Sequence, residues 1–381
     1  MIMNKKIIRI SHTPLYTRSR RLSYADAFLS HGYIFEYWDM TDYFHLTTIN
    51  VDGAENANFV KKIDSIKKVK EALNNLDCKN SIFFIGIPER WEHREFYKLL
   101  TQYQCRLVRV NPCANTLRIA KSPNDIISFL CSPSRILAYI KRFLFKIYCN
   151  KNNIRYYDVF SSSKEEFRTK SINHPDYDEY IFTLKNLKDD EIKGGYAVFY
   201  DSYFPLHPDF TYIHKLRIKV DYKHYLKSMN RFFDYIERQY NLKVVIAAHP
   251  SSKYNDCDFN GRRIIKWHTC ALTINAQIII NQSSNSTSFA ALANKPILFI
   301  TNDDIEQCRY MSRYISTLSN FLGKKKYNID NCDYDKIPIS KIKEPFRDRY
   351  INTFLTDKST YKSTNAEIFS EYVDNEMNEV E

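Results

Sequence analysis

The sequence predicts an α/β protein in which two Rossmann-like domains face a cleft. Short apolar runs rich in β-branched residues alternate along the chain with stretches of helical periodicity, which is the pattern of repeated βα units. The chain has 381 residues, more than the roughly 250 to 300 at which one hydrophobic core stops growing, so two domains are expected. Several apolar runs end in polar residues, as parallel strands do where an open sheet binds ligands.

Two βαβ units are predicted in the first half of the chain, since alternating apolar runs flank segments with helical spacing. The expected elements are a strand at 5–10, a helix at 22–30 closed by His31-Gly32, strands at 33–38 and 81–86, a helix at 92–102 and a strand at 105–110. Together they form a small parallel sheet with right-handed crossovers.

The segment 134–148 has the pattern of an amphipathic helix. Its apolar positions on one helical face are Ile136, Leu137, Ile140, Phe143, Leu144 and Ile147. Its basic positions, which line much of the other face, are Arg135, Lys141, Arg142 and Lys146. Two interpretations stay open, a helix on a membrane surface and an ordinary helix packed on the sheet. We favour the packed helix.

The second half repeats the βα pattern and predicts another Rossmann-like sheet. The expected elements are a strand at 196–200, a long helix at 222–236, a strand at 244–249, a helix at 267–276, a strand at 278–281, a short helix at 290–294 and a strand at 297–300. The predicted organisation is an N-terminal acceptor domain at 1–160, a polar linker at 161–193, a donor domain at 194–343, and a C-terminal helix with an acidic tail at 344–381.

Polar residues follow two of the strands in the second half. His249-Pro250 follows the strand at 244–249, and the proline fixes the local backbone. A histidine there can donate to a phosphate oxygen or protonate a leaving phosphate. The other strand leads into a hydroxyl-rich run, Ser283, Ser284, Asn285, Ser286 and Thr287, just before a helical pattern. Hydroxyls and backbone N–H groups at a helix start predict a phosphate site.

Asp201 ends the strand at 196–200 and is expected at the same edge as His249. A carboxylate there can take a proton from a hydroxyl nucleophile, so Asp201 is the candidate base. Asp209 and His207, in the same loop, have a similar claim. Turn formation or helix capping is the competing interpretation for each of them.

The loop after the first strand carries His12, Arg18, Arg20 and Arg21. Guanidinium groups suit carboxylates and phosphates, so these residues are candidates for binding an anionic acceptor or a lipid-linked saccharide. An exposed basic loop without a ligand is the competing interpretation.

Composition excludes several other classes of protein. Only seven glycines are present and none is spaced as Gly-x-Gly-x-x-Gly, while no Walker-A lysine accompanies the serine run. The nine cysteines lack a Cys-x-x-Cys pair, which disfavours a zinc site and a disulfide framework. The net charge of +12 suits an anionic partner, but no nucleic-acid-binding motif accompanies it. With no signal peptide or membrane span predicted, we expect a cytoplasmic protein, and peripheral association with the inner membrane stays open.

The His-Pro after one C-terminal strand and the serine-rich turn that opens the helix of 286–296 resemble motifs of the GT-B glycosyltransferases of bacterial capsule, lipopolysaccharide and O-antigen synthesis. The closest resemblance is to the sialyltransferase and Kdo-transferase types that hold the phosphate of a CMP-sugar. It implies that His249 and the pair Ser283 and Ser284, or the adjacent Ser286, bind that phosphate, and that an Asp serves as base. It covers about residues 196–300. Many GT-B enzymes carry a ribose-binding Glu where this chain has Ala290 and Ala291, which disfavours a retaining enzyme that uses a UDP- or GDP-sugar.

The leading hypothesis is an inverting glycosyltransferase that moves a sugar from a nucleotide donor to a polymeric or lipid-linked surface saccharide. The nucleotide-sugar is a co-substrate, and neither a metal nor another cofactor is expected. Two alternatives stay open. One is a phosphotransferase that uses a CDP-polyol, and the other is a non-catalytic basic protein of an envelope assembly.

Overall fold

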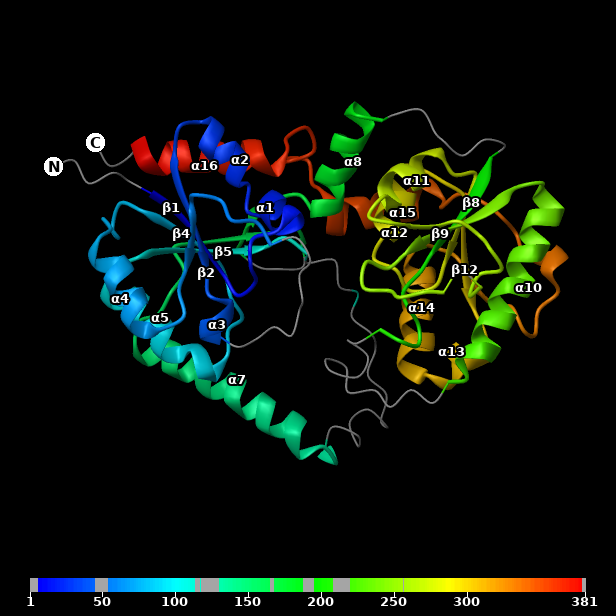
Figure 1. The fold of residues 1–381 in the computed structure, drawn as a ribbon, viewed down its shortest axis with the longest axis horizontal. Helices are drawn as coiled ribbons and strands as arrows, with labels where there is room; N and C mark the ends of the chain where they lie inside the picture. The colour runs from blue at the N-terminus through cyan, green and yellow to red at the C-terminus, as the bar shows by residue number, and fades with distance from the viewer. Residues whose placement is uncertain are drawn as a thin grey trace. The chain divides into compact units, whose positions relative to one another are not determined.

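The computed structural model describes residues 6–44, 54–113, 117, 130–164, 168–187, 195–207, 220–255 and 257–378. The chain forms two compact units. Unit 1 comprises Met1–Ala114, Ala120–Asn173 and Asp357–Glu381, and unit 2 comprises Asn115–Ile119 and His174–Thr356. The C-terminal segment therefore belongs to the N-terminal unit (Figure 1).

Unit 1 is built on a seven-stranded sheet in the order β3-β2-β1-β4-β5-β6-β7, in which every neighbouring pair is parallel. The strands are β1 (Lys6–Ser11), β2 (Ile34–Asp39), β3 (Val60–Lys62), β4 (Ile82–Gly86), β5 (Arg106–Asn111), β6 (Asp158–Ser161) and β7 (Lys170–Ser171). The helices are α1 (Thr17–Leu22), α2 (Ala25–Ser30), α3 (Thr41–Phe44), α4 (Ile66–Asn74), η1 (Trp91–His93), α5 (Arg94–Gln102), α7 (Pro133–Lys151) and α16 (Asn365–Asn378).

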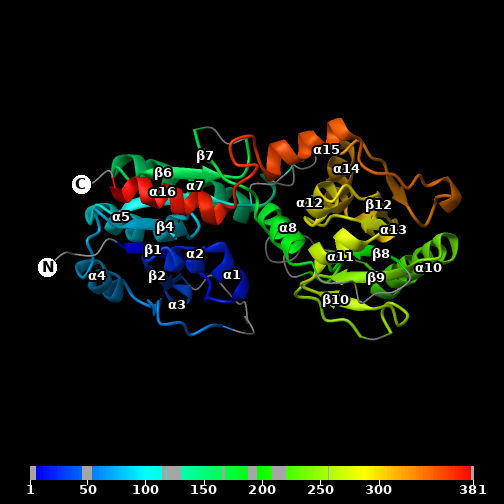
Figure 2. The same ribbon diagram turned by 90° about the horizontal axis from the view of Figure 1, so that it is seen from above.

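The two faces of this sheet bury separate apolar cores, because neighbouring side chains of a strand point to opposite faces. In β1, Ile8 and Ile10 contribute to one core and Ile7 to the other. Phe369 and Val373 of α16 are fully buried in the second core, beside α2. The last helix of the chain thus completes the first domain (Figure 2).

Unit 2 contains a six-stranded parallel sheet in the order β10-β9-β8-β11-β12-β13. Its strands are β8 (Tyr196–Tyr200), β9 (Lys243–Ala248), β10 (Ile264–Lys266), β11 (Ile278–Asn281), β12 (Ile297–Thr301) and β13 (Lys326–Asn328). Its helices are α8 (Pro175–Lys185), α10 (Tyr222–Tyr240), α11 (Thr269–Asn275), α12 (Thr287–Leu292), α13 (Asp303–Gln307), α14 (Arg309–Phe321), η2 (Tyr334–Lys336), α15 (Glu344–Tyr350) and η3 (Ile351–Leu355). All five residues of β8 are buried, as expected for a central strand covered on both faces.

The predicted α/β class with two Rossmann-like sheets is confirmed, and the details differ in three places. The helix predicted from residue 22 to residue 30 begins only at Ala25, as α2, while α1 ends at Leu22, because Tyr24 has a φ of 55° and interrupts the helical backbone. The segment 161–193, interpreted as a linker, contains β7 and α8. The helix predicted at 134–148 packs on unit 1 through Phe145, but most of its apolar side chains in α7 are exposed and not packed on the sheet.

Candidate functional site

The carboxyl edge of the unit 2 sheet holds the candidate site. From β8 the chain passes outward through β9 to β10 and then returns to β11 on the other side of β8. This reversal makes the ends of β8 and β11 a topological switch point, where open α/β sheets bind ligands. Because β8 lies between β9 and β11, the ends of those two strands are roughly 10 Å apart, two strand spacings. A phosphorylated ligand that lies across the end of β8 can reach both.

Asp201 lies at the end of β8 and is only 5% exposed. Its Oδ1 accepts from the backbone N–H of Tyr203 at 2.8 Å, and its Oδ2 accepts from the backbone N–H of His249 at 3.1 Å. The hydroxyl of Tyr254 adds a third hydrogen bond. Burial raises the pKa of Asp201, and these three bonds act in the opposite direction. Both carboxylate oxygens are thus already used to hold the β8 and β9 loops together.

His249 follows β9, and its ring orientation is fixed by two contacts. The backbone N–H of Ser251 donates to Nδ1 at 3.2 Å, so Nδ1 carries the lone pair of the neutral ring. The proton therefore resides on Nε2, which lies 3.2 Å from Nε2 of His207. The two imidazole rings meet nearly edge to face, with centroids 4.4 Å apart. The neutral pair places an N–H donor of His249 beside the lone pair of His207.

The serine-rich turn after β11 is held by the buried side chain of Asn281. Its Oδ1 accepts from the N–H of Ser284 at 3.2 Å, and its Nδ2 donates to the hydroxyl of Thr287 at 2.7 Å. The hydroxyl oxygen of Ser284 accepts from the N–H of Ser286 at 3.2 Å, so its own proton can still be donated outward. Asn281 is the residue that gives the turn its shape.

The residues of the turn divide by exposure. Ser283, Ser284 and Ser286 are half-buried and Asn285 is exposed, whereas the side chain of Thr287 is fully buried. The hydroxyl of Thr287 also donates to the carbonyl of Ser284 at 2.7 Å. A ligand can therefore reach the half-buried and exposed members of the predicted set, whereas the buried Thr287 holds the turn.

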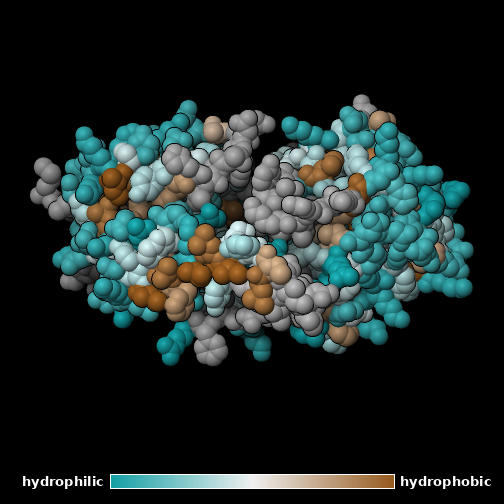
Figure 3. Space-filling view, turned by 90° about the horizontal axis from the view of Figure 1, so that it is seen from below, coloured by the Kyte–Doolittle hydropathy of each residue, from teal (hydrophilic) through white to brown (hydrophobic). Residues whose placement is uncertain are grey.

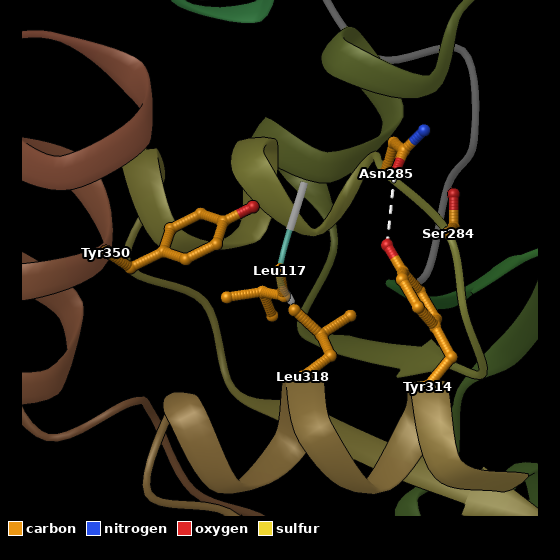
Figure 4. Close-up of a pocket in the computed structure, with 6 residues that line it drawn as sticks. All are labelled: Leu117, Ser284, Asn285, Tyr314, Leu318 and Tyr350. Atoms are coloured by element: carbon orange, nitrogen blue, oxygen red, sulfur yellow. Dashed lines mark hydrogen bonds between the residues drawn. The ribbon is translucent and has the colours of Figure 1, made fainter. Parts of the chain in front are cut away.

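A small pocket adjoins the turn, lined by Leu117, Ser284, Asn285, Tyr314, Leu318 and Tyr350. Tyr314 and Leu318 come from α14, and Tyr350 ends α15 (Figure 4). The hydroxyl of Tyr314 donates to Oδ1 of Asn285 at 3.4 Å. This side of the turn therefore places aromatic and aliphatic side chains beside polar groups.

Sequence reasoning missed the residues that support the site, above all Tyr254 and Ser251. Tyr254 is a donor to Asp201, and burial with the nearby carboxylate raises the pKa of its hydroxyl. The available signal was the position of Asp201 directly after a fully apolar strand, which predicts a buried carboxylate in need of several donors.

A second polar cluster, also missed, lies at the ends of β12 and β13. Asp330 accepts from Ser228, from Arg231 at 2.8 Å and from the N–H of Asp303 at 3.0 Å. Beside it, Nδ1 of His224 lies 2.7 Å from Asp304, and this carboxylate raises the pKa of His224. These bonds fix the start of α10 against the loops that follow β12 and β13.

In unit 1, His12 directly follows β1 at the corresponding edge of the first sheet. Its Nδ1 lies 2.8 Å from the carbonyl oxygen of Gly86, which can only accept, so Nδ1–H is the donor and Nε2 is left as an acceptor. Burial lowers the pKa of His12, and the charges of Arg9 and Arg90 act in the same direction. His12 is thus held as a neutral hydrogen-bond acceptor.

The remaining predicted residues of unit 1 are in or near α1. Arg20 donates to Asp26 at 2.6 Å and to Glu55 at 2.9 Å, so two carboxylates already share its charge. Arg21 is exposed. The side chain of Arg18 lies outside the described residues, as does the whole of Asp209, the second candidate base in unit 2.

Two further observations concern the described part of the chain. No group of three or more His, Cys, Asp or Glu side chains there is placed to hold a metal ion. Nor does any helix there combine the length and apolarity needed to cross a membrane.

The sequence matches no protein-family model and no curated protein at a significant level. Among solved structures, the wall teichoic acid polymerase TagF aligns with 98% of this chain and 90% of its own, with a TM-score of 0.51 and 10% identity. A TagF variant soaked with CDPG aligns with 98% and 90%, with a TM-score of 0.50 and 12% identity. The UDP-GlcNAc 2-epimerase from Methanocaldococcus jannaschii aligns with 97% and 99%, with a TM-score of 0.51 and 14% identity.

The chain has the GT-B fold. Structural similarity at 10 to 14% identity shows a fold of two Rossmann-like domains and nothing about the substrate. The function of this chain therefore depends on the side chains at the carboxyl edges of its two sheets.

Proposed function

We propose that this chain is a transferase that takes its donor as a nucleotide-linked phosphate ester and moves the donor group to a hydroxyl of a surface saccharide. The observation that carries the proposal is the Nε2–H of His249 at the switch-point edge. Ser251 fixes its tautomer, Asp201 accepts from the backbone N–H of His249, and Nε2 is paired with His207. A preorganised donor beside a developing phosphate charge is what departure of a nucleotide requires.

The donor phosphates lie, in this proposal, across the end of β8. His249 donates to the oxygen that gains charge as the bond breaks, and the hydroxyls of Ser283 and Ser284 donate from the β11 side, with Ser286 and Asn285 next along the turn. Asp201, Thr287 and Pro250 keep these groups in place without touching the ligand. Removal of one such donor costs ~10² to 10³ in rate at oxyanion sites of comparable design.

Asp201 is poorly placed to act as the base, because it is only 5% exposed and each of its oxygens already accepts a backbone hydrogen bond. In this proposal the donor phosphate takes over the Nε2–H of His249, which in the structure is paired with Nε2 of His207 at 3.2 Å. The Nε2 of His207 is thereby released and accepts the proton of an attacking hydroxyl. We therefore assign the base to His207 and the positioning of His249 to Asp201. Asp209, two residues further along the chain, is the alternative base.

The leading form of this activity is an inverting glycosyltransferase that acts on a nucleotide-sugar, with a CMP-linked nonulosonate as the first donor to test. The His-Pro and Ser-Ser motifs support it, and the buried Ala290 and Ala291 leave no carboxylate in α12 to bind a ribose. The acceptor is a polymeric or lipid-linked saccharide, and His12 is its candidate contact in unit 1.

A CDP-polyol phosphotransferase is the second candidate, and one observation favours it. The donor His249 and the base His207 are in direct contact, so the base lies beside the phosphate that His249 binds. That placement brings the base beside the phosphorus that an acceptor hydroxyl would attack. The fold similarity to a TagF variant soaked with CDPG is consistent with this candidate.

Product analysis separates the two forms. The purified protein is incubated with CMP-sialic acid, CDP-glycerol, UDP-GlcNAc and GDP-mannose, and nucleotide and co-product are identified by mass spectrometry. Without an added acceptor, water takes the transferred group. Free sugar released with the nucleotide supports the glycosyltransferase, whereas glycerol phosphate released with CMP supports the phosphotransferase. No turnover and no binding of any donor would contradict the proposal and favour a non-catalytic binding protein.

A further inference from the structure

Helix α7 is held to unit 1 by one edge only. Phe145 is its sole buried residue, and its ring packs edge to face on Tyr97 of α5 with centroids 5.6 Å apart. Nearby, Tyr148 packs on Trp91 of η1, and Lys141 pairs with Glu92 at 2.5 Å. The 19 residues of α7 extend for roughly 28 Å, so most of the helix surface faces away from these contacts.

The outward face of α7 is apolar. We call its exposed side chains the apolar stripe, and they are Leu137, Tyr139, Ile140, Phe143, Leu144 and Ile147. Their exposed fractions run from 41% for Leu144 to 65% for Tyr139. At about 3.6 residues per turn these positions share one face over three turns. Figure 3 shows the corresponding line of hydrophobic surface over α7.

Charge on α7 has a single sign. The helix carries five basic residues, Arg135, Lys141, Arg142, Lys146 and Lys151, and no acidic residue. Helical spacing places Arg135, Arg142 and Lys146 together along one edge of the apolar stripe, next to Tyr139 and Phe143. Lys141 lies toward the opposite edge, where Glu92 balances its charge.

We propose that α7 binds the surface of an anionic lipid bilayer, lying in the plane of the interface with the apolar stripe among the acyl chains. Basic side chains along the edge of such a stripe can extend to lipid phosphates while their aliphatic parts stay in the apolar layer. Tyrosine at the margin suits the same boundary. Two copies of the helix, face to face, would bring basic edges together, so charge favours an anionic membrane over a second copy of the chain.

Flotation with vesicles tests this inference without any assay of activity. We expect the full-length protein to bind phosphatidylcholine vesicles that contain phosphatidylglycerol at least ~10-fold more tightly than pure phosphatidylcholine. The triple variant Ile140→Gln/Phe143→Gln/Leu144→Gln keeps good helix formers on exposed positions and should lose ~10-fold or more of that binding. The variant Arg142→Gln/Lys146→Gln should lose ~10-fold on anionic vesicles only.

The matched control is Phe182→Gln/Leu184→Gln in α8, where the two side chains are 60% and 45% exposed. It should bind within about two-fold of wild type, and all variants should keep the wild-type unfolding midpoint because the positions are on the surface. Equal binding to neutral and anionic vesicles, or wild-type binding by the triple variant, would overturn the proposal. A dimer in light scattering that the triple variant abolishes, without vesicle binding, would overturn it in favour of a second copy.

Discussion

The two sheets have the same strand order around their first strand, three-two-one-four-five-six, but their carboxyl edges carry different chemistry. In unit 2 the edge holds a buried carboxylate, a histidine of fixed tautomer and a hydroxyl turn shaped by Asn281. In unit 1 the edge holds His12 and an arginine already shared by two carboxylates. Common packing rules explain the common order, whereas function depends on the loops that each sheet presents.

The largest effect that separates the two edges should come from His249→Ala. Loss of the Nε2–H donor of His249 after β9 should lower turnover of the accepted nucleotide-linked substrate by ~10² to 10³. His31→Ala changes an exposed histidine in unit 1 and should leave turnover unchanged. Steady-state rates of nucleotide release measure both. A rate for His249→Ala within a few-fold of wild type would remove the unit 2 edge from the chemistry.

Asp201→Asn tests whether the buried carboxylate positions His249 or acts as a base. In the variant an NH₂ group replaces one carboxylate oxygen and cannot accept from the backbone N–H that this oxygen bonds. The free energy of unfolding should therefore fall by ~1 to 3 kcal/mol, and turnover should fall ~10-fold. The pH–rate profile should keep its shape if Asp201 only positions. Asp26→Asn, at an exposed ion pair, should change stability by less than about 0.5 kcal/mol. Loss of the acidic limb of the profile in Asp201→Asn would make Asp201 the base.

A smaller change is expected for Ser283→Ala/Ser284→Ala. Two outward hydroxyls contribute hydrogen bonds to a charged phosphate, so the dissociation constant of the nucleotide should rise ~10-fold or more. Isothermal titration calorimetry measures this. Ser30→Ala/Ser359→Ala, at exposed positions, provides the control. Unchanged nucleotide affinity in the Ser283/Ser284 variant would place the phosphate elsewhere.

The smallest expected effect is a pH dependence of stability that comes from His12, at the carboxyl edge of the unit 1 sheet. Burial lowers the pKa of His12, so below about pH 6.5 the unfolded chain binds a proton that the folded protein resists, and stability falls as the pH falls. Above that pH the contribution is fully present. In denaturant titrations at about pH 8 and about pH 5.5, wild type should lose more stability than His12→Asn, whose amide can still donate to Gly86. Equal losses would mean that His12 is not held neutral.

The sequence was sufficient for the class of fold and for the strands that lead to the site. Apolar runs such as Ile278–Asn281 were recognisable because buried parallel strands are apolar on both faces. Short edge strands such as β7 carry no such signal, since two residues give no period. The exposed face of α7 could not be predicted, because periodicity shows that a helix has an apolar face and not what covers that face.

The candidate site was predictable only in part. His249 and the serine run follow strands whose position is clear from sequence, and strand order brings them to one edge. The partners that decide their roles come from outside the motifs. Tyr254 and the backbone N–H of Ser251 are set by loop geometry, and it is they that engage Asp201 and fix the tautomer of His249.

The most direct test of the unit 2 site is thermal unfolding of wild type and His249→Ala with CMP, CDP, UDP, GDP and ADP in turn. A nucleotide at 100 times its dissociation constant adds about 2.7 kcal/mol to the stability of the state that binds it, enough to raise the midpoint by several degrees. We predict a rise with a cytidine nucleotide that His249→Ala reduces or abolishes. An unchanged midpoint with all five nucleotides, or an equal rise in the variant, would contradict a phosphate site at the carboxyl edge of this sheet.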